Sequence, residues 1–308
     1  MIVRVALINI LCSVLVAPAA QIPPFFIDSV VALGRSEVRT PGQQAEWIAE
    51  ASGFLYGEPV DHETDPAKHQ YSVYLVTNRH VIANHASITM RINAQKANDP
   101  VQDLPLSLKN PDGIDAWFSH PNPSIDISVI RLNAQYLRDH GLSTSFFPAD
   151  QHVADKAKLK EIETSAGDGI FVLGFPMGLS GTAQRNYVIA RRGSIARISD
   201  LLDSTAASFL IDASIFPGNS GGPVVSALTM SALQGTKSQD RVYLIGVVRA
   251  YLPYTDVAIS QQTGQIRMVS QENSGLAEVL PVDYINETIT ALRAAESKRL
   301  PAPKPDKK

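Results

Sequence analysis

The sequence predicts an all-β fold with one helix near its C-terminal end. Short apolar or alternating runs recur along most of the chain and are separated by Gly, Pro, Asn and Asp, which is typical of a β-sandwich or β-barrel. Helical spacing of apolar residues is concentrated in one late segment. The 308 residues show no internal repeat and no linker-like stretch, and 44% of them are apolar, which is enough for a well-buried core.

Nine of these runs are predicted strands. In the segment 125–131, Ile125, Ile127 and Val129 alternate with polar residues, so they mark one buried face. Asp126 therefore lies on the other face of that strand. In chain order, the predicted strands are Val30–Leu33, Gly53–Tyr56, Tyr71–Thr77, Ala86–Ile92, Ile125–Leu132, Ile170–Phe175, Tyr187–Ala190, Phe209–Ala213 and Val242–Val248.

The predicted helix lies after the last of these strands. Val282, Ile285, Ile289 and Leu292 are spaced by three, four and three residues and would form one apolar stripe that packs on a barrel. The segment 300–308 follows with three prolines and no apolar periodicity. We expect this tail to be disordered, because it has too little apolar surface to bury.

The N-terminal residues predict a secretory signal. Arg4 precedes an apolar run from Val5 to Val16, and Ala17-Pro18-Ala19 then places small residues at the spacing that signal peptidase reads, which predicts removal of residues 1–19. An uncleaved membrane anchor is the alternative, although the run is shorter than the roughly 20 residues that span a bilayer. Cleavage would remove Cys12, the only cysteine, so the exported chain would have no disulfide; this suits a bacterial periplasmic or secreted protein.

Composition also limits the partners and cofactors. The formal net charge is −3 and no dense Lys/Arg cluster is present, which argues against a nucleic-acid surface. The polar stretch 57–70 contains His62, His69 and several carboxylates, but nothing in the sequence fixes them in a common geometry. We interpret the stretch as a solvated loop, and we predict neither a metal nor an organic cofactor.

A serine between glycines is the strongest candidate for chemistry. Residues 212–223 read Asp-Ala-Ser-Ile-Phe-Pro-Gly-Asn-Ser-Gly-Gly-Pro, with Ser220 at the centre of the glycines. Such a turn can aim backbone N–H groups at one point beside a serine hydroxyl, as a nucleophile with an oxyanion hole requires. The same residues are common turn formers, so the interpretation depends on a histidine and an aspartate elsewhere.

His80 is the best-placed histidine, and its surroundings resemble a known family. It follows the predicted strand 71–77, and the run Val76-Thr77-Asn78-Arg79-His80-Val81 resembles the segment carrying the general base in bacterial trypsin-like serine peptidases of the HtrA/Deg type. Three further segments are similar to that family in the same chain order: Ser52-Gly53-Phe54-Leu55, Ile125-Asp126-Ile127-Ser128-Val129-Ile130 and the Ser220 loop; Leu173–Gly178 resembles its Gly-x-Pro-x-Gly turn.

The resemblance covers about residues 30–285 and implies a fold and a domain plan. The fold would be a chymotrypsin-like pair of six-stranded antiparallel β-barrels with the active site in the cleft between them. Residues 20–285 would form this protease domain, and residues 286–308 would hold the end of the helix and the tail. No PDZ domain is expected after the barrels, which departs from the HtrA/Deg pattern.

The resemblance also implies site residues. Ser220 would be the nucleophile, His80 the general base and Asp126 the carboxylate that orients His80. The oxyanion hole would be formed by the loop Gly218, Asn219 and Ser220, with the N–H groups of Gly218 and Ser220 as donors. The substrate pocket would be lined by Ser214, Val247, Val248 and Arg249.

Pocket composition suggests a specificity. Ser214 is not acidic, so a buried Arg or Lys of the substrate would lack a partner there. We expect small or medium apolar residues at the cleavage site, although Arg249 leaves a preference for polar or acidic groups open.

Two other functions are compared with the peptidase interpretation. A non-catalytic peptide-binding protein could keep the same fold, although no member of the triad is missing here. An α/β-hydrolase would also contain Gly-x-Ser-x-Gly, but its histidine follows the serine, and no histidine follows Ser220 in this chain. The sequence thus favours an exported serine endopeptidase whose partner is a protein or peptide substrate, without stable membrane association once the signal is removed; it leaves the oligomeric state open.

Overall fold

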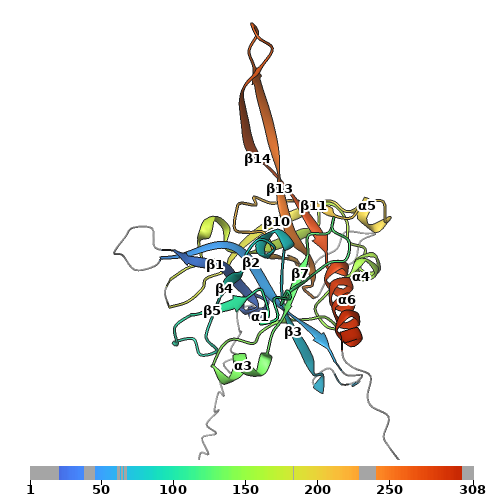
Figure 1. The fold of residues 1–308 in the computed structure, drawn as a ribbon. Coiled ribbons are helices and arrows are strands. Elements are labelled where there is room, and N and C mark those ends of the chain that lie inside the picture. The colour runs from blue at the N-terminus through green and yellow to red at the C-terminus, as the bar shows by residue number, and fades with distance from the viewer. Residues whose placement is uncertain are drawn as a thin grey trace, which may run out of the picture.

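The computed structural model describes residues 21–37, 46–60, 63, 65, 68–182, 184–228 and 241–299. Within these ranges the chain forms two β-sheets, against which the C-terminal helix packs (Figure 1). The predicted signal at residues 1–19 and the predicted tail at 300–308 lie outside the described residues. In the part of the chain that the structure describes, no helix is both long and apolar enough to cross a membrane.

The first sheet is built from the N-terminal half of the chain. Seven of its eight strands follow the order β5-β4-β1-β2-β3-β7-β6. The eighth strand, β8, lies outside this order and pairs with β2 in parallel. The strands are β1 Val30–Glu37, β2 Glu46–Pro59, β3 Tyr71–Thr77, β4 Ser87–Ile92, β5 Gln102–Ser107, β6 Phe118–Ser119, β7 Ser128–Arg131 and β8 Phe147–Pro148. In the described ranges β5 and β6 end this order and do not pair with each other, so the sheet is curved but open.

The second sheet is a closed antiparallel barrel in the order β10-β11-β14-β13-β12-β9. Its strands are β9 Gly169–Gly174, β10 Ile189–Arg197, β11 Phe209–Asp212, β12 Pro223–Ser226, β13 Leu244–Ile259 and β14 Ile266–Pro281. The predicted all-β class and chymotrypsin-like arrangement are confirmed, with one six-stranded barrel closed and its N-terminal counterpart open in the described residues. Each of the nine predicted strands overlaps an observed one.

Alternation of apolar residues explains where the core lies. Inward-facing side chains of the second barrel, such as Phe209, Ile211 and Val224, form one buried cluster. Leu33, Leu55 and Leu75 belong to a second cluster, inside the first sheet. A third cluster joins the two halves, because it includes residues from both sheets and from the helix. The two sheets therefore share one apolar interface, along which the site residues are arranged.

Helix α6, Asp283–Arg299, is the predicted C-terminal helix. Ile285 and Ile289 are completely buried and Leu292 is partly buried against the shared cluster, so the predicted apolar stripe is confirmed. The Tyr56 hydroxyl donates a hydrogen bond of 2.6 Å to Asn286 Oδ1 and so ties the helix to β2. The other helical segments are short: α1 Pro24–Asp28, α2 Arg79–Ile82, α3 Ala134–Asp139, α4 Lys156–Glu161, η2 Pro176–Gly178 and α5 Ser199–Leu202.

A long two-stranded arm extends from the second barrel (Figure 1). Strands β13 and β14 leave the barrel together and remain paired as far as Ile259 and Ile266. Apolar side chains on this arm are exposed, namely Leu252, Tyr254, Val257, Ile259, Ile266, Met268 and Val269. We call residues 252–274 the arm. The sequence prediction stopped the strand at Val248 and therefore missed it.

Packing in the barrel leads to a stability prediction. Phe209 is completely buried in the barrel cluster, so Phe209→Ala should lower the free energy of unfolding by about 3–5 kcal/mol. Urea unfolding followed by circular dichroism would measure this. Ile114→Ala, at a position that is 45% exposed, is the matched control and should change stability by less than about 0.5 kcal/mol. Equal effects of the two substitutions would contradict the assigned core.

Candidate active site

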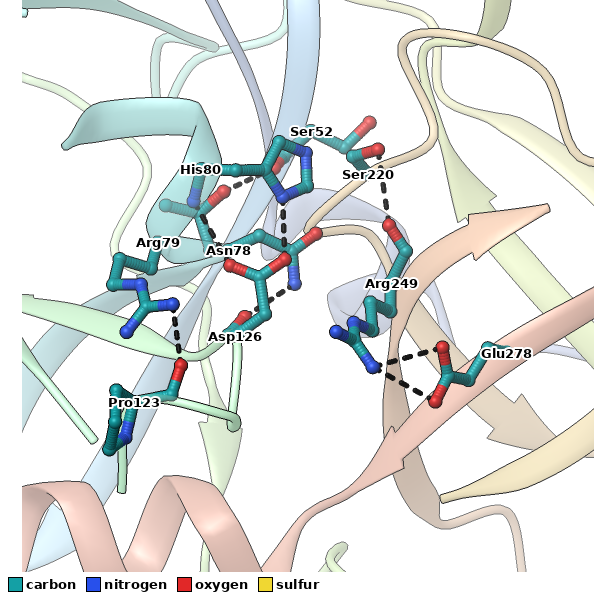
Figure 2. Close-up of polar contacts among 10 residues, drawn as sticks. Ser52, Asn78, Arg79, His80, Pro123, Asp126, Ser220, Arg249 and Glu278 are labelled. Atoms are coloured by element: carbon teal, nitrogen blue, oxygen red, sulfur yellow. Dashed lines mark hydrogen bonds and ion pairs between the residues drawn. The ribbon is translucent and has the colours of Figure 1, made fainter. Parts of the chain in front are cut away.

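His80 is held by Asp126 at the junction between β3 and α2. Strand β3 ends at Thr77, and His80 lies in the short helix that follows. His80 Nδ1 lies 2.6 Å from Asp126 Oδ2, and the His80 backbone N–H donates to Asp126 Oδ1 at 3.0 Å (Figure 2). Two contacts to one carboxylate fix both the position and the orientation of the imidazole. The Nε2 atom of the ring is left facing away from Asp126.

Asp126 is placed so that it stays ionised. Its side chain is only 12% exposed, and its backbone carbonyl accepts a hydrogen bond of 2.8 Å from Asn78 Nδ2. Burial alone would raise the pKa of Asp126, but the hydrogen bonds from His80 and the positive charges of His80 and Arg249 outweigh it and lower the pKa below its usual value. An ionised Asp126 holds the proton of His80 on Nδ1.

Ser220 lies in the loop between β11 and β12. Its hydroxyl Oγ is 3.5 Å from the backbone carbonyl oxygen of Arg249, as Figure 2 shows. Among the described residues no hydrogen bond joins Ser220 Oγ to His80. The side chain of His80 is 52% exposed, so its Nε2 edge is open to solvent and to an approaching group. The structure therefore contains the His80–Asp126 pair and leaves the hydroxyl of Ser220 turned toward β13.

The Ser220 loop is shaped by glycines at close approaches. Gly218 has a φ of 99°, and a Cβ added there would lie 2.3 Å from the Phe175 carbonyl oxygen. Gly221 has a φ of 79°, and its added Cβ would lie 2.3 Å from the Ser52 carbonyl oxygen. Only glycine fits both the backbone conformation and the space. The loop consequently packs directly on the first sheet, beside the strand that leads to His80.

Ser52 joins this loop to the first sheet. Its completely buried hydroxyl donates to the Gly218 carbonyl oxygen at 2.7 Å and accepts from the Phe175 backbone N–H at 2.9 Å. Its backbone N–H also donates to the Ser220 carbonyl oxygen at 2.9 Å. Ser52 lies in a segment that resembles the family, but its residue type alone predicts no role; only the tertiary contacts show that it positions the loop.

The predicted oxyanion-hole residues differ in whether their backbone N–H groups already donate a hydrogen bond. In the described part of the chain, the backbone N–H groups of Gly218 and Ser220 donate no hydrogen bond, so both are available to an oxyanion. Asn219 was predicted with them, but its N–H donates to the Phe216 carbonyl oxygen at 3.0 Å. Its side-chain Oδ1 accepts from the Phe216 N–H at 3.1 Å. Asn219 was predicted as part of this loop and not as a donor, and its contacts stabilise the turn.

The predicted pocket residues also need correction. Val247 and Val248 are completely buried in core clusters, so neither side chain can contact a substrate without repacking. Ser214 is exposed, and its carbonyl oxygen accepts a hydrogen bond from Arg191 Nη1. Of the strand residues predicted to line the pocket, only Arg249 has an accessible side chain.

Arg249 occupies a β-bulge beside the site. The pairing of β13 with β14 shifts register between Val248 and Ala250, so Arg249 has no residue opposite it in the backbone pairing with β14. Such a bulge redirects a side chain out of the regular alternation. The Arg249 side chain is 38% exposed, and its Nη1 lies 3.1 Å from both carboxylate oxygens of Glu278 (Figure 2). Its charge also lowers the pKa of Asp126 after the larger effects of burial and His80.

The polar stretch 57–70 can be followed only in part. Asp61 and His62 lie outside the described residues. His69 Nδ1 is 2.6 Å from Asp150 Oδ2, and the Tyr71 hydroxyl donates to the same carboxylate at 2.9 Å. Within the described ranges no group of three His, Cys, Asp or Glu side chains could hold a metal ion.

Comparison with known proteins assigns the chain to a family. The model of the trypsin-like peptidase domain matches residues 51–233, which is more than half of the chain and includes His80, Asp126 and Ser220. This chain belongs to the trypsin-like peptidases. The peptidase-type hydrolase function of that family is therefore the coarse functional class of the chain. No curated protein sequence matches it.

Solved structures resemble this trypsin-like peptidase only distantly. The MamO protease domain from Magnetospirillum magneticum, in its apo form, is 15% identical and aligns with a TM-score of 0.42 over 85% of this chain and 96% of its own. The Rv3671c protease, in an inactive form, is 16% identical with a TM-score of 0.40 over 87% of this chain and 90% of its own.

The ionised Asp126 gives a pH-dependent stability prediction. Because its pKa in the folded state is depressed below the usual 3.8, its stabilising contribution is complete above that value and is lost as the pH falls through the lower, folded-state pKa. Asp126→Asn should therefore be less stable than the wild type at pH 7, and the difference should shrink below about pH 4. Urea unfolding of both proteins from pH 7 to pH 3 measures this. A difference independent of pH would show that Asp126 contributes only packing.

The Ser52 contacts give a second prediction. Ser52→Ala would leave the buried Gly218 carbonyl and Phe175 N–H without their partner, which costs about 1–3 kcal/mol of stability. Thr77→Val, which removes the hydroxyl that donates to the Ser52 carbonyl oxygen at 2.9 Å, is a control of similar burial that leaves the Gly218 contact in place. If Ser220 is a nucleophile, as we propose in the next subsection, only Ser52→Ala should also slow its labelling by a fluorophosphonate. Equal labelling rates in both variants would rule out positioning of the loop by Ser52.

Proposed function

We propose that this trypsin-like peptidase is a serine endopeptidase that hydrolyses peptide bonds through Ser220, His80 and Asp126. The observation that carries the proposal is the double contact between His80 and Asp126, which orients an accessible imidazole. The glycine-shaped loop that bears Ser220 packs against the residues leading to His80 and supports the same assignment. Family membership supplies the peptidase class.

The mechanism would follow from these positions. The Ser220 hydroxyl would rotate from the Arg249 carbonyl toward His80 Nε2, a change of one side-chain rotamer. Oγ would attack the scissile carbonyl as His80 accepts its proton, and His80 would later protonate the leaving amine. Asp126 would stabilise the imidazolium, and the free N–H groups of Gly218 and Ser220 would donate to the oxyanion. Loss of the amine would leave Ser220 acylated. His80 would then take a proton from water as the water oxygen attacks the ester carbonyl, and would return that proton to Ser220 Oγ as the ester bond breaks and the acid product leaves.

The specificity follows from the residues that remain accessible. Ser214 offers no negative charge to a substrate Arg or Lys, which supports cleavage after small or medium apolar residues. The Glu278 carboxylate already neutralises Arg249, which argues against a strong preference for acidic residues. We place this activity outside the cytoplasm, in the periplasm or secreted, on the basis of the predicted signal at residues 1–19.

One observation favours a second candidate, a peptide-binding protein without turnover. The Ser220 hydroxyl contacts the Arg249 carbonyl rather than His80, as expected if the serine is not activated. The intact His80–Asp126 pair argues for the peptidase, since a protein that only binds peptides has no need of an oriented base. A measurement of peptide-bond hydrolysis distinguishes the peptidase from the peptide-binding protein.

Replacement of the nucleophile tests the proposal. The wild-type protein should cleave an unfolded protein such as casein and should react with a fluorophosphonate at Ser220, as mapped by mass spectrometry. Ser220→Ala should abolish labelling and lower kcat by about 10⁶-fold, as in other triads, with an unchanged circular dichroism spectrum. Ser214→Ala is the matched control and should retain the labelling. A wild type that neither cleaves nor reacts would support the peptide-binding alternative.

A further inference from the structure

The inner end of the arm is continuous with the site. The residues that precede the arm on β13 contact the Ser220 loop directly: Val248 exchanges backbone hydrogen bonds with Gly221 and Gly222, and the Arg249 carbonyl faces Ser220 Oγ. From there β13 runs without interruption to Ile259. One strand therefore connects the position of bond cleavage with the tip of the arm (Figure 1).

One edge of β13 is unpaired along the arm. Strand β12 pairs with β13 only from Val225 to Pro223, opposite Leu244 to Val247. Beyond Val248, the only strand that pairs with β13 in the described ranges is β14. An unpaired edge is a template on which an extended polypeptide can add as a further strand. Here that edge begins beside the nucleophile.

The arm also lacks the usual protection of an exposed edge. Exposed edges are commonly blunted by charged side chains, above all lysine. Residues 252–274 contain no lysine and only three charged side chains, Asp256, Arg267 and Glu272. Pro253 removes one N–H donor from the edge, so a bound chain could not form an unbroken ladder there. Side chains further out must therefore contribute to any binding.

Those side chains form an apolar strip on one face of the arm. Val257 pairs across the strands with Val269, and Ile259 pairs with Ile266. Val257 and Ile259 are two apart on β13 and so share a face, and cross-strand partners share that face too. Ile266 and Val269 are three apart on β14, but the register shift between Ala258 and Ile259 brings both to this face, and all four side chains are exposed. An isolated two-stranded hairpin is only marginally stable in water. Coverage of this strip by another chain would bury apolar surface and stabilise the arm.

We infer that the arm is an extended binding site for the unfolded, apolar segment of the substrate that lies on the N-terminal side of the scissile bond. This rests on the proposed function, in which the residue before the scissile bond lies against Ser214 and against Arg249 of β13. The chain upstream of that residue leaves the site along the unpaired edge of β13. The arm thus selects extended apolar polypeptides over short peptides and over folded proteins.

Two extended substrates test this inference. A fluorogenic octapeptide is compared with the same peptide bearing eight apolar, β-prone residues on either its N-terminal or its C-terminal side. For the wild type, the N-terminal extension should raise kcat/KM by about tenfold or more, as expected from burial of a few apolar side chains, and the C-terminal extension should not. Equal gains from both extensions would overturn the inference.

A shortened arm provides the matched variant. Replacement of residues 255–271 by Asn-Gly joins Tyr254 to Glu272, which already pair across the strands, and keeps the Arg249–Glu278 contact. This variant should lose the gain from the N-terminal extension and should cleave the unextended octapeptide within about twofold of the wild type. The milder double variant Val257→Thr/Val269→Thr should lose most of the gain, whereas Asp256→Asn, on the other face, should keep it.

A binding measurement separates this inference from the proposed function. Fluorescence anisotropy of the N-terminally extended peptide is measured with Ser220→Ala, with and without the shortened arm, and needs no turnover. Weaker binding by about tenfold after shortening supports the arm site even if the wild type cleaves nothing, in which case only the proposed function fails. Unchanged binding overturns the inference. A shift from dimer to monomer on shortening, with unchanged binding, would assign the arm to a second copy of the chain instead.

Discussion

The site depends on one buried side chain, Ser52, which connects the two halves of the fold. Its hydroxyl binds the Gly218 carbonyl and the Phe175 N–H, and its backbone binds the Ser220 carbonyl. His80 follows β3 and Asp126 precedes β7 of the first sheet, whereas Ser220 lies in a loop of the second, so their relative position is set by contacts across the shared interface. Hydrogen bonds there are short and shielded from water, which makes them strongly directional. Ser52 therefore fixes the loop that bears Ser220 against the sheet that leads to His80.

Strands with one buried face were predictable because burial on one side imposes a period of two on the sequence. The segments around Ile127 and Ile211 alternate in this way, and helix α6 followed from its own stripe. The segment around Tyr74 is buried on both faces and was recognised as a continuous apolar run. The arm was missed for the same reason. Both of its faces are exposed, so residues 252–274 carry no alternation that a core would select. Strand β5 was missed because it contains Pro105, which is tolerated there because β5 ends the sheet order.

The site residues were predicted from resemblance, and the structure shows what such a prediction leaves out. His80 and Asp126 do meet, and Gly218 and Ser220 keep their N–H groups free. Asn219 is adjacent to both in the chain, but its own N–H is used by the turn. Val247 and Val248 were assigned to the pocket from their place in the chain, although neighbours on a strand point to opposite faces and here both faces are packed. Proximity in sequence did not reveal side-chain direction.

The irregular pairing of β13 and β14 affects which mutations the arm and the barrel can each accept during evolution. Register shifts at Val248/Ala250 and Tyr251/Pro253 separate the arm from the barrel, and a third shift, at Ala258/Ile259, lies within the arm near its tip. In a regular hairpin, adding or removing one residue reverses every side chain beyond it. Here the irregularities absorb such a change before it reaches Val247 and Val279. Mutation can therefore lengthen, shorten or recompose the arm while the hydrolytic centre keeps its geometry, so substrate range and chemistry are free to evolve separately.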